Sequence, residues 1–305
     1  MATINIDKLF QEAAERGDPF AQFELALALD YGNNVEQDYE KAGAWYSKAA
    51  DQGHKSAEIN LLLQHIFGEA RWLRPEVVFA RLQKLAESGD REAQNNLGLC
   101  HQHGYGTPQN YQEAATWFRR AADGGLGTAQ FNLGGLYYEG WGFEKNLAHA
   151  IDWYTRAAQQ REELALLQLG RMYQKGIGVE VNLNRAFILF LIAYKRGSVR
   201  AANHLGLMFK KGIGTERDDA IAYKLYLESV SSPDAPDAPE NLSYRGTAYY
   251  WLGYMEEHGE GVERNLRNAR RWYTRGAACD QANCVEALKR LRSRASDIRC
   301  RNKHP

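Results

Sequence analysis

The sequence predicts an all-α fold: a right-handed α-α superhelix, or solenoid, of about seven helix-turn-helix repeats with a single capping helix at each end. Three observations support this fold class. Small residues recur at one fixed spacing, each period contains two stretches of helical periodicity, and paired glycines separate those stretches. Because an isolated helix pair cannot bury both of its apolar stripes, such pairs must stack on one another.

The period is set by alanines that follow one another at intervals of 36 residues. The first six are Ala21, Ala57, Ala93, Ala129, Ala165 and Ala201. A leucine four positions after each alanine and a glycine eleven positions after it keep the same step. A seventh copy starts at Ala248, 47 residues after the sixth alanine, so an insertion of 11 residues precedes it.

Each period is predicted to hold two helices, called helix A and helix B. Over residues 129–138 the apolar and small side chains fall at i, i+4, i+5 and i+8, which is one face of a helix. After the turn Gly140-Trp141-Gly142, a second apolar stripe covers residues 147–158. Tryptophan and a following aromatic residue in helix B, such as Trp153 and Tyr154, are expected to fill the space between helices.

The same spacing sets the domain boundaries of one solenoid over residues 1–305, with 16 helices in all. In chain order these are a capping helix (1–17), repeats one to six (18–230), a Pro-rich insertion (231–247), repeat seven (248–280), and a capping helix with a basic tail (281–305). The last helix is expected from about Gln281 to Arg294. Prolines at every third position of the insertion (Pro233, Pro236 and Pro239) favour an extended polyproline II segment around Ser231 to Glu240.

Two segments show the motif most clearly: AQNNLGLCHQHGYGTPQNYQEAATWFRRAADGG and AQFNLGGLYYEGWGFEKNLAHAIDWYTRAAQ. They resemble the Sel-one-like repeat, a relative of the tetratricopeptide repeat, and the resemblance covers nearly the whole chain. It implies an α-solenoid that holds other proteins together or binds a peptide, in signalling, secretion, envelope regulation or toxin immunity. It does not specify the partner.

Three repeats depart from this pattern. The second has Arg81 and Leu82 where others have tryptophan and an aromatic residue, and Ala70 replaces its second turn glycine. Repeats five and six have Leu189 and Leu225 in place of the tryptophan. These three repeats are expected to pack less typically.

The net charge is zero, because 38 basic residues balance 38 acidic ones. It therefore implies no partner that binds through the net charge of the whole protein. The two ends differ in sign: residues 1–58 carry 11 acidic and 5 basic residues, whereas residues 264–303 carry 12 basic and 3 acidic ones. Weak head-to-tail self-association is therefore one possibility. Nucleic acid is not the expected partner, because the basic tract from Lys289 onward has no aromatic residue on which bases could stack.

No stretch reaches the roughly 18 consecutive apolar residues of a membrane-spanning helix. The first residues lack the basic and apolar regions of a secretory signal, which favours a cytoplasmic location.

Motifs for catalysis or metal binding are missing from the sequence. The Gly-x-Gly elements lie between predicted helices and lack the ending of a phosphate-binding loop, so turns are expected. His101 and His103 would lie on different sides of a helix, which favours a packing role for His101 over a metal pair. The carboxylate pairs Asp218–Asp219 and Glu256–Glu257 are expected to be solvated. The prediction is a protein that is not an enzyme and has no cofactor or metal.

Helix A is expected, by analogy with other helix-pair stacks, to line a concave face that binds the ligand. The candidate binding residues on this face are Asn95, Phe131, Tyr138, Arg171, Lys175, Arg200, Asn203, Lys210, Tyr250 and Tyr254. Asparagine amides can hold a peptide backbone, and Arg171 and Arg200 can bind a carboxylate with two hydrogen bonds. The alternative is that neighbouring turns shield the apolar residues and that the lysines only solvate the surface.

The predicted function is a non-enzymatic scaffold or adaptor that binds a protein or an extended peptide. The alternative is a dedicated inhibitor or immunity protein that wraps one toxin or enzyme.

Overall fold

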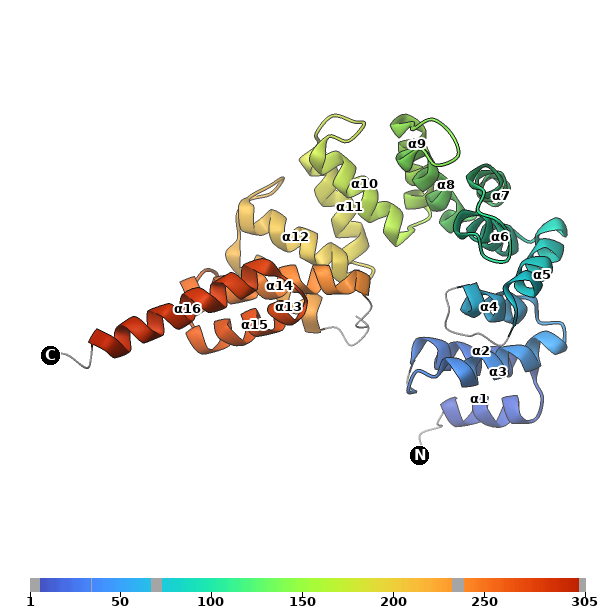
Figure 1. Cartoon of the computed structure of the whole chain (residues 1–305), viewed down its shortest axis with the longest axis horizontal. Coiled ribbons are helices and arrows are strands. Elements are labelled where there is room, and N and C mark those ends of the chain that lie inside the picture. The colour runs from blue at the N-terminus through green and yellow to red at the C-terminus, as the bar shows by residue number, and fades with distance from the viewer. Residues whose placement is uncertain (1–5, 34, 67–72, 232–238, 302–305) are drawn as a thin grey trace. The chain divides into compact units, whose positions relative to one another are not determined.

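The computed structural model describes residues 6–33, 35–66, 73–231 and 239–301, and this part of the chain consists of sixteen α-helices and their turns (Figure 1). Their bounds are α1 Ile6–Glu15, α2 Pro19–Tyr31, α3 Tyr39–Asp51, α4 Lys55–Ile66, α5 Pro75–Glu87, α6 Arg91–His103, α7 Tyr111–Asp123, α8 Gly127–Glu139, α9 Leu147–Gln159, α10 Glu163–Lys175, α11 Leu183–Tyr194, α12 Val199–Lys211, α13 Asp219–Ser231, α14 Pro239–His258, α15 Leu266–Ala278 and α16 Ala282–Arg301. The predicted all-α repeat solenoid, with one helix, seven pairs and one helix, is confirmed.

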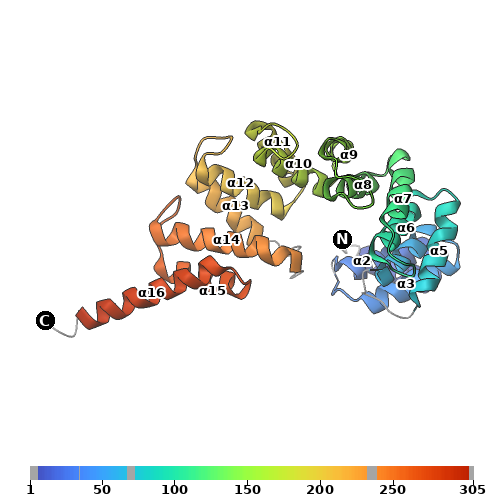
Figure 2. The same cartoon turned by 45° about the horizontal axis from the view of Figure 1, so that its top comes forward.

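The chain divides into two compact units, Met1–Trp153 and Tyr154–Pro305, with the boundary inside α9. In the first unit, consecutive helices from α1 to α8 pack on one another in chain order. In the second unit, α10 to α16 do the same, and α14 also contacts α12 and α16, so helices A of successive pairs touch directly. Figures 1 and 2 show these rows of helix pairs within each unit.

A side chain caps the start of helix A in repeats one, three and six, whereas Leu126 and Glu162 at the starts of α8 and α10 make no such hydrogen bond. Asp90 Oδ1 accepts a hydrogen bond of 2.9 Å from the backbone N–H of Ala93, and Ser198 Oγ accepts one of 3.1 Å from Ala201. These caps satisfy backbone donors that a helix end leaves unpaired. Helix A ends at the first turn glycine, as at Gly104 with a left-handed φ of 71°, whose N–H donates to the carbonyl of Cys100.

The second turn glycine lies against the preceding helix B. At Gly214 (φ 69°) an added Cβ would come within 2.8 Å of the Leu183 carbonyl oxygen at the start of α11. The Gly-x-Gly element is therefore a turn in which one glycine ends a helix and the other lets two repeats approach, as predicted.

A glycine in helix A also faces an aromatic ring of its partner helix B. A Cβ on Gly98 would lie 2.6 Å from the ring of Phe118, one on Gly170 would lie 2.5 Å from Phe190, and one on Gly253 would lie 2.7 Å from Tyr273. The facing aromatic side chains of Tyr46, Phe118 and Tyr273 are buried as predicted, and Phe190 and Tyr226 occupy the same place in repeats five and six. In repeats three, five, six and seven, an aromatic ring of helix B therefore packs directly on the helix-A backbone at a glycine.

Two helices differ from their predicted bounds. α14 begins at Pro239, so residues 240–247, assigned to the Pro-rich insertion, are helical, and the extended segment predicted up to Glu240 is wrong at its end. Pro239 occupies the first turn, where proline is tolerated because its missing N–H would be unpaired anyway. The remaining prolines of the insertion lie outside the described residues. α16 continues past Arg294 to Arg301 because the sequence offers no glycine or proline to end it.

We expect Gly98→Ala to destabilise the protein by about 1–2 kcal/mol. Overpacking against a fixed ring costs roughly 1–3 kcal/mol, and the better helix propensity of alanine returns up to about 1 kcal/mol. Urea unfolding followed by circular dichroism measures the change. In a Phe118→Leu background the same substitution should cost less, since the smaller side chain makes room. An equal cost in both backgrounds would show that the ring is not what excludes the methyl group.

Candidate protein-binding surfaces of the repeat array

The candidate residues on the predicted concave face belong to helices A, whose outward side we call the helix-A surface. Three of the ten, Asn95, Phe131 and Tyr138, lie in the first unit on α6 and α8. The other seven lie in the second unit on α10, α12 and α14. They are therefore described as two groups rather than as one site.

In the first unit, the asparagines are bonded to one another. Asn132 Nδ2 donates to Asn95 Oδ1 over 2.9 Å, and Asn95 Nδ2 donates to Asn96 Oδ1 over 3.2 Å. Asn95 is only 7% exposed, so this amide connects α6 to α8 inside the protein. Phe131 and Tyr138 are half-buried, and the Lys145 ammonium lies 5.1 Å from the centre of the Tyr138 ring.

In the second unit, Lys210 is also used internally. Its side chain is buried, and its ammonium pairs with Asp219 Oδ1 at 3.0 Å and with Glu260 Oε2. This ion pair joins α12 to the start of α13 and to the turn after α14. Its charge is matched by the protein's own carboxylates, so Lys210 does not form part of an open cationic site.

Three other cations, Arg171, Lys175 and Arg200, form the group that we call the basic cluster, on α10 and α12. Arg171 and Lys175 act on His204, whose pKa is lowered to about 4 chiefly by burial and further by the repulsion of these two charges. The Arg200 guanidinium lies 5.8 Å from the centre of the Tyr244 ring. Arg171 and Lys175 therefore place two positive charges near the side of α12 that carries His204.

Asn203 lies beside the basic cluster. Its Nδ2 donates to the Tyr244 carbonyl at 2.6 Å, whereas its Oδ1 is buried without a hydrogen-bond partner. His204 Nε2 is likewise buried and unpaired, and its ring stacks on Phe190 with centroids 4.5 Å apart. Buried polar atoms are nearly always satisfied, so this corner of the protein holds unused hydrogen-bonding capacity.

Tyr250 and Tyr254 belong to an aromatic cluster on α14. Tyr254 stacks on His258 with centroids 4.1 Å apart, and Tyr250 lies 6.2 Å from both Tyr254 and Tyr273. Burial raises the pKa of Tyr250, with a smaller contribution from Tyr254. Both rings are half-buried, so they offer only an edge to a ligand.

The expectation that Glu256 and Glu257 are solvated is wrong, since each is only 3% exposed. Glu256 Oε1 accepts hydrogen bonds from Tyr223 (2.7 Å) and Trp272 (3.1 Å). Glu257 Oε2 accepts from the Tyr273 hydroxyl at 3.0 Å and pairs with Arg290 of α16. These carboxylates join α14 to its neighbours, so they hold the C-terminal cap in place.

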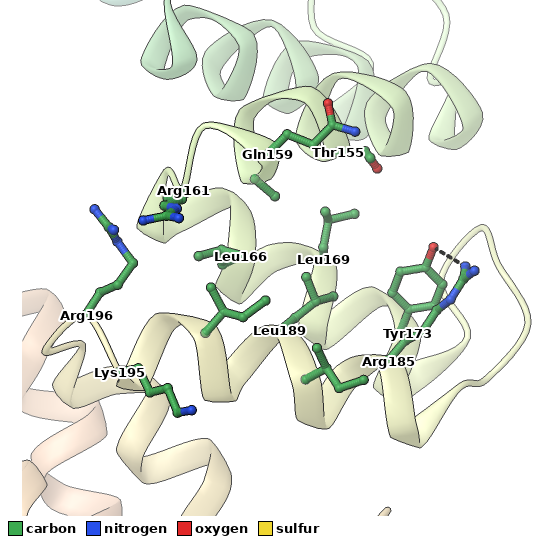
Figure 3. A pocket seen from close by; sticks show the side chains of 13 residues that line it. Thr155, Gln159, Arg161, Leu166, Leu169, Tyr173, Arg185, Leu189, Lys195 and Arg196 are labelled. Carbon is green, nitrogen blue, oxygen red and sulfur yellow. Dashed lines mark hydrogen bonds between the residues drawn. The ribbon is translucent and has the colours of Figure 1, made fainter.

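A pocket of about 880 Å³ lies in the second unit between the end of α9, α10 and α11 (Figure 3). Leucines and isoleucines line it together with four basic residues: Arg161, Arg185, Lys195 and Arg196. The sequence reasoning did not find this pocket. The signal was present in Leu189, which replaces the helix-B tryptophan and lines the pocket.

A family model described as Sel1 repeat matches six segments of the chain: residues 19–54, 91–126, 127–161, 164–198, 199–232 and 246–281. The chain belongs to the Sel1 repeat family. Residues 55–90 have no match, and they contain the second predicted repeat, where Arg81 and Leu82 replace the aromatic pair.

Two solved structures are similar to the chain over most of its length. A Sel1 repeat protein from Oxalobacter formigenes is 26% identical, with a TM-score of 0.67, over 93% of this chain and 80% of the other. A protective antigen of uropathogenic Escherichia coli with an SLR fold, c5321, is 28% identical, with a TM-score of 0.57, over 96% of this chain and 68% of the other. No curated protein matches the chain significantly.

Sel1 repeats commonly mediate protein–protein interactions and are generally non-catalytic. Among the residues with a described position, no three His, Cys, Asp or Glu side chains are grouped so that they could hold a metal ion. His101 has the predicted packing role, with its ring 5.3 Å from that of Phe79 in an edge-on contact. No helix within the described ranges is both long and apolar enough to cross a bilayer.

The buried ring of His204 predicts a loss of stability in mild acid. The unfolded chain takes up a proton on this ring near pH 6.5, whereas the folded chain does so only near pH 4, so the unfolded state binds more protons in between. Lowering the pH from 7 to 5 should therefore reduce the free energy of unfolding by about 2 kcal/mol through this group.

His204→Phe keeps a ring against Phe190 and removes the titration. The pH dependence of urea unfolding should be smaller in this variant by the same amount. Equal slopes in the two proteins between pH 5 and pH 7 would contradict the assignment.

Proposed function

We propose that this Sel1 repeat chain is a non-enzymatic scaffold that binds an acidic segment of a partner protein or peptide on the helix-A surface of its second unit. The observation that carries the proposal is the pair Arg171 and Lys175. Neither forms an ion pair within the described part of the chain, although both lie close enough to the His204 ring to lower its pKa. Cations held near each other without carboxylates favour an anionic ligand.

The chemistry of the surroundings supports a peptide as the ligand. Arg171 and Arg200 can each hold a carboxylate through two parallel hydrogen bonds. Asn203 is left out of this site because its Oδ1, although unpaired, is buried. The half-buried edges of Tyr250 and Tyr254 provide apolar contact on α14. Asn95 and Lys210 are left out of this site because the protein's own side chains occupy them.

Charge reversal of the pair tests the proposal. Affinity capture with the full chain and with the Arg171→Glu/Lys175→Glu variant should yield a partner that only the unchanged protein retains. With that partner purified, we expect the affinity of the variant to be at least about tenfold lower, and the affinity of the unchanged protein to fall with added salt.

Arg267→Glu/Arg270→Glu is the matched control, because it makes the same charge change at exposed positions of α15, a helix B. Capture of the same partners at the same affinity by both double variants would overturn the site. A single stoichiometric partner whose complex survives high salt would favour the inhibitor over the adaptor.

A further inference from the structure

We propose that the pocket between the end of α9, α10 and α11 is a second protein-binding groove, which takes an amphipathic helix with aliphatic side chains on one face and carboxylates at both ends. This groove lies on the helix-B side of the array, so it differs from the basic cluster. The inference rests on the proposed function only in taking the chain to be a protein-binding scaffold.

The apolar part of the groove is open to solvent. Leu166, Leu169 and Leu189 form its lining toward the core (Figure 3). Ile188 and Ile192, one turn apart on α11, are 53% and 39% exposed. Isolated exposed apolar residues are ordinary, but a continuous aliphatic lining with exposed walls is typical of an interaction surface.

Comparison among the repeats shows that this surface is particular to repeat five. The residues at the register of Ile188 and Ile192 are Ala44 and Lys48, Ala80 and Lys84, Thr116 and Arg120, Asp152 and Arg156, Lys224 and Glu228, and Arg271 and Arg275. In every other repeat the second of these positions is charged. Only repeat five is aliphatic at both.

In repeats one, three and seven the cation at the second position lies over the helix-B tryptophan. The charged group of Lys48 lies 3.8 Å from the ring centre of Trp45, that of Arg120 lies 4.4 Å from Trp117, and that of Arg275 lies 5.2 Å from Trp272. Repeat five has Leu189 for the tryptophan and Ile192 for the cation, so both members of the pair are replaced together. The hollow lies where the tryptophan ring and the cation of the other repeats would lie.

Four cations surround the hollow. Arg185 lies at the start of α11, where it donates to the Tyr173 hydroxyl at 3.1 Å, and Lys195 and Arg196 lie just past the end of the helix. Arg161 completes this end from the turn before α10. No carboxylate lines the groove, and none of the four cations is in an ion pair within the described ranges. Ten residues of helix separate Arg185 from Lys195, a span of about 15 Å.

Because the groove has cations at both ends, it favours a ligand with an anionic group at each end. A fatty acid has one anionic head, so it would leave one end of the groove unmatched. A helix of about three turns with acidic residues at each end matches both ends, and aliphatic side chains at i, i+3, i+4 and i+7 would fill the hollow between them. Charge complementarity and the shape of the apolar lining therefore favour a partner helix.

The probe is a synthetic helical peptide of about 14 residues with capped ends, two acidic residues at each end and leucines at i, i+3, i+4 and i+7 between them. We expect it to bind the full chain in calorimetry or fluorescence anisotropy. The variant Ile188→Asp/Ile192→Arg carries the residues of repeat four (Asp152 and Arg156), keeps the net charge, and should bind at least about tenfold more weakly. Ile221→Asp, at an exposed isoleucine of α13 outside the groove, is the matched control and should bind normally.

A second variant keeps the test decisive if the first one unfolds. Arg185→Gln/Lys195→Gln changes exposed side chains only, and it should weaken binding and its salt dependence together. No binding of the peptide to the unchanged protein, or equal binding by the groove variants, would overturn the proposal. Laurate that binds this groove in place of the peptide would also overturn it.

The Arg171→Glu/Lys175→Glu variant separates this proposal from the previous one. It should bind the peptide normally, because neither residue lines the groove. If it loses the peptide while the groove variants retain it, the helix lies on the helix-A surface and the groove is wrong.

Discussion

The close approach of helix A to helix B is the contact on which the rest of the array depends, and in repeats three, five, six and seven it places a glycine of helix A beneath an aromatic ring of helix B. At Gly98 and Phe118, and again at Gly170 and Phe190, the ring lies where a methyl group would have to be. This contact sets the distance between the two helices of a pair. Alanines at the repeat positions then allow the next pair to stack at a similarly short distance. With the interior defined in this way, residues on the outer sides are free to differ from repeat to repeat.

The fold was predictable because a solenoid depends on neighbours in sequence. A period of 36 residues repeats the same packing, so one pair explains the others. The helix starts at Asp90 and Ser198 could have been found too, because each capping residue stands three positions before a repeat alanine. The burial of Glu256 and Glu257 could not be read from the periodicity of their own helix. It depends on Tyr273 and on other side chains from α13, α15 and α16.

The candidate surfaces were predictable only in part, for the same physical reason. Arg171 and Lys175 were selected because their repeat positions are expected to face outward, and neither forms an ion pair within the described residues. Lys210 and Asn95 were assigned to the same helix-A surface, yet side chains from other elements, Asp219 and Asn132, bind them. Position in the repeat predicts which way a side chain points, but it does not predict which side chains of other helices will contact it. The groove could not be predicted from Leu189 alone, because it also requires Ile192 in place of the cation that lies over the tryptophan in other repeats.

The exchange of a tryptophan and its cation for an aliphatic pair leaves the ring of Phe190 buried against Gly170. Interior and exterior of a repeat are thus independent modules of the sequence. Duplication of a gene segment that encodes one such unit would copy any docking feature on it and place the copy beside the original in a fixed register. A protein built in this way can acquire bivalent attachment to a partner in one genetic step, with no adjustment of its core.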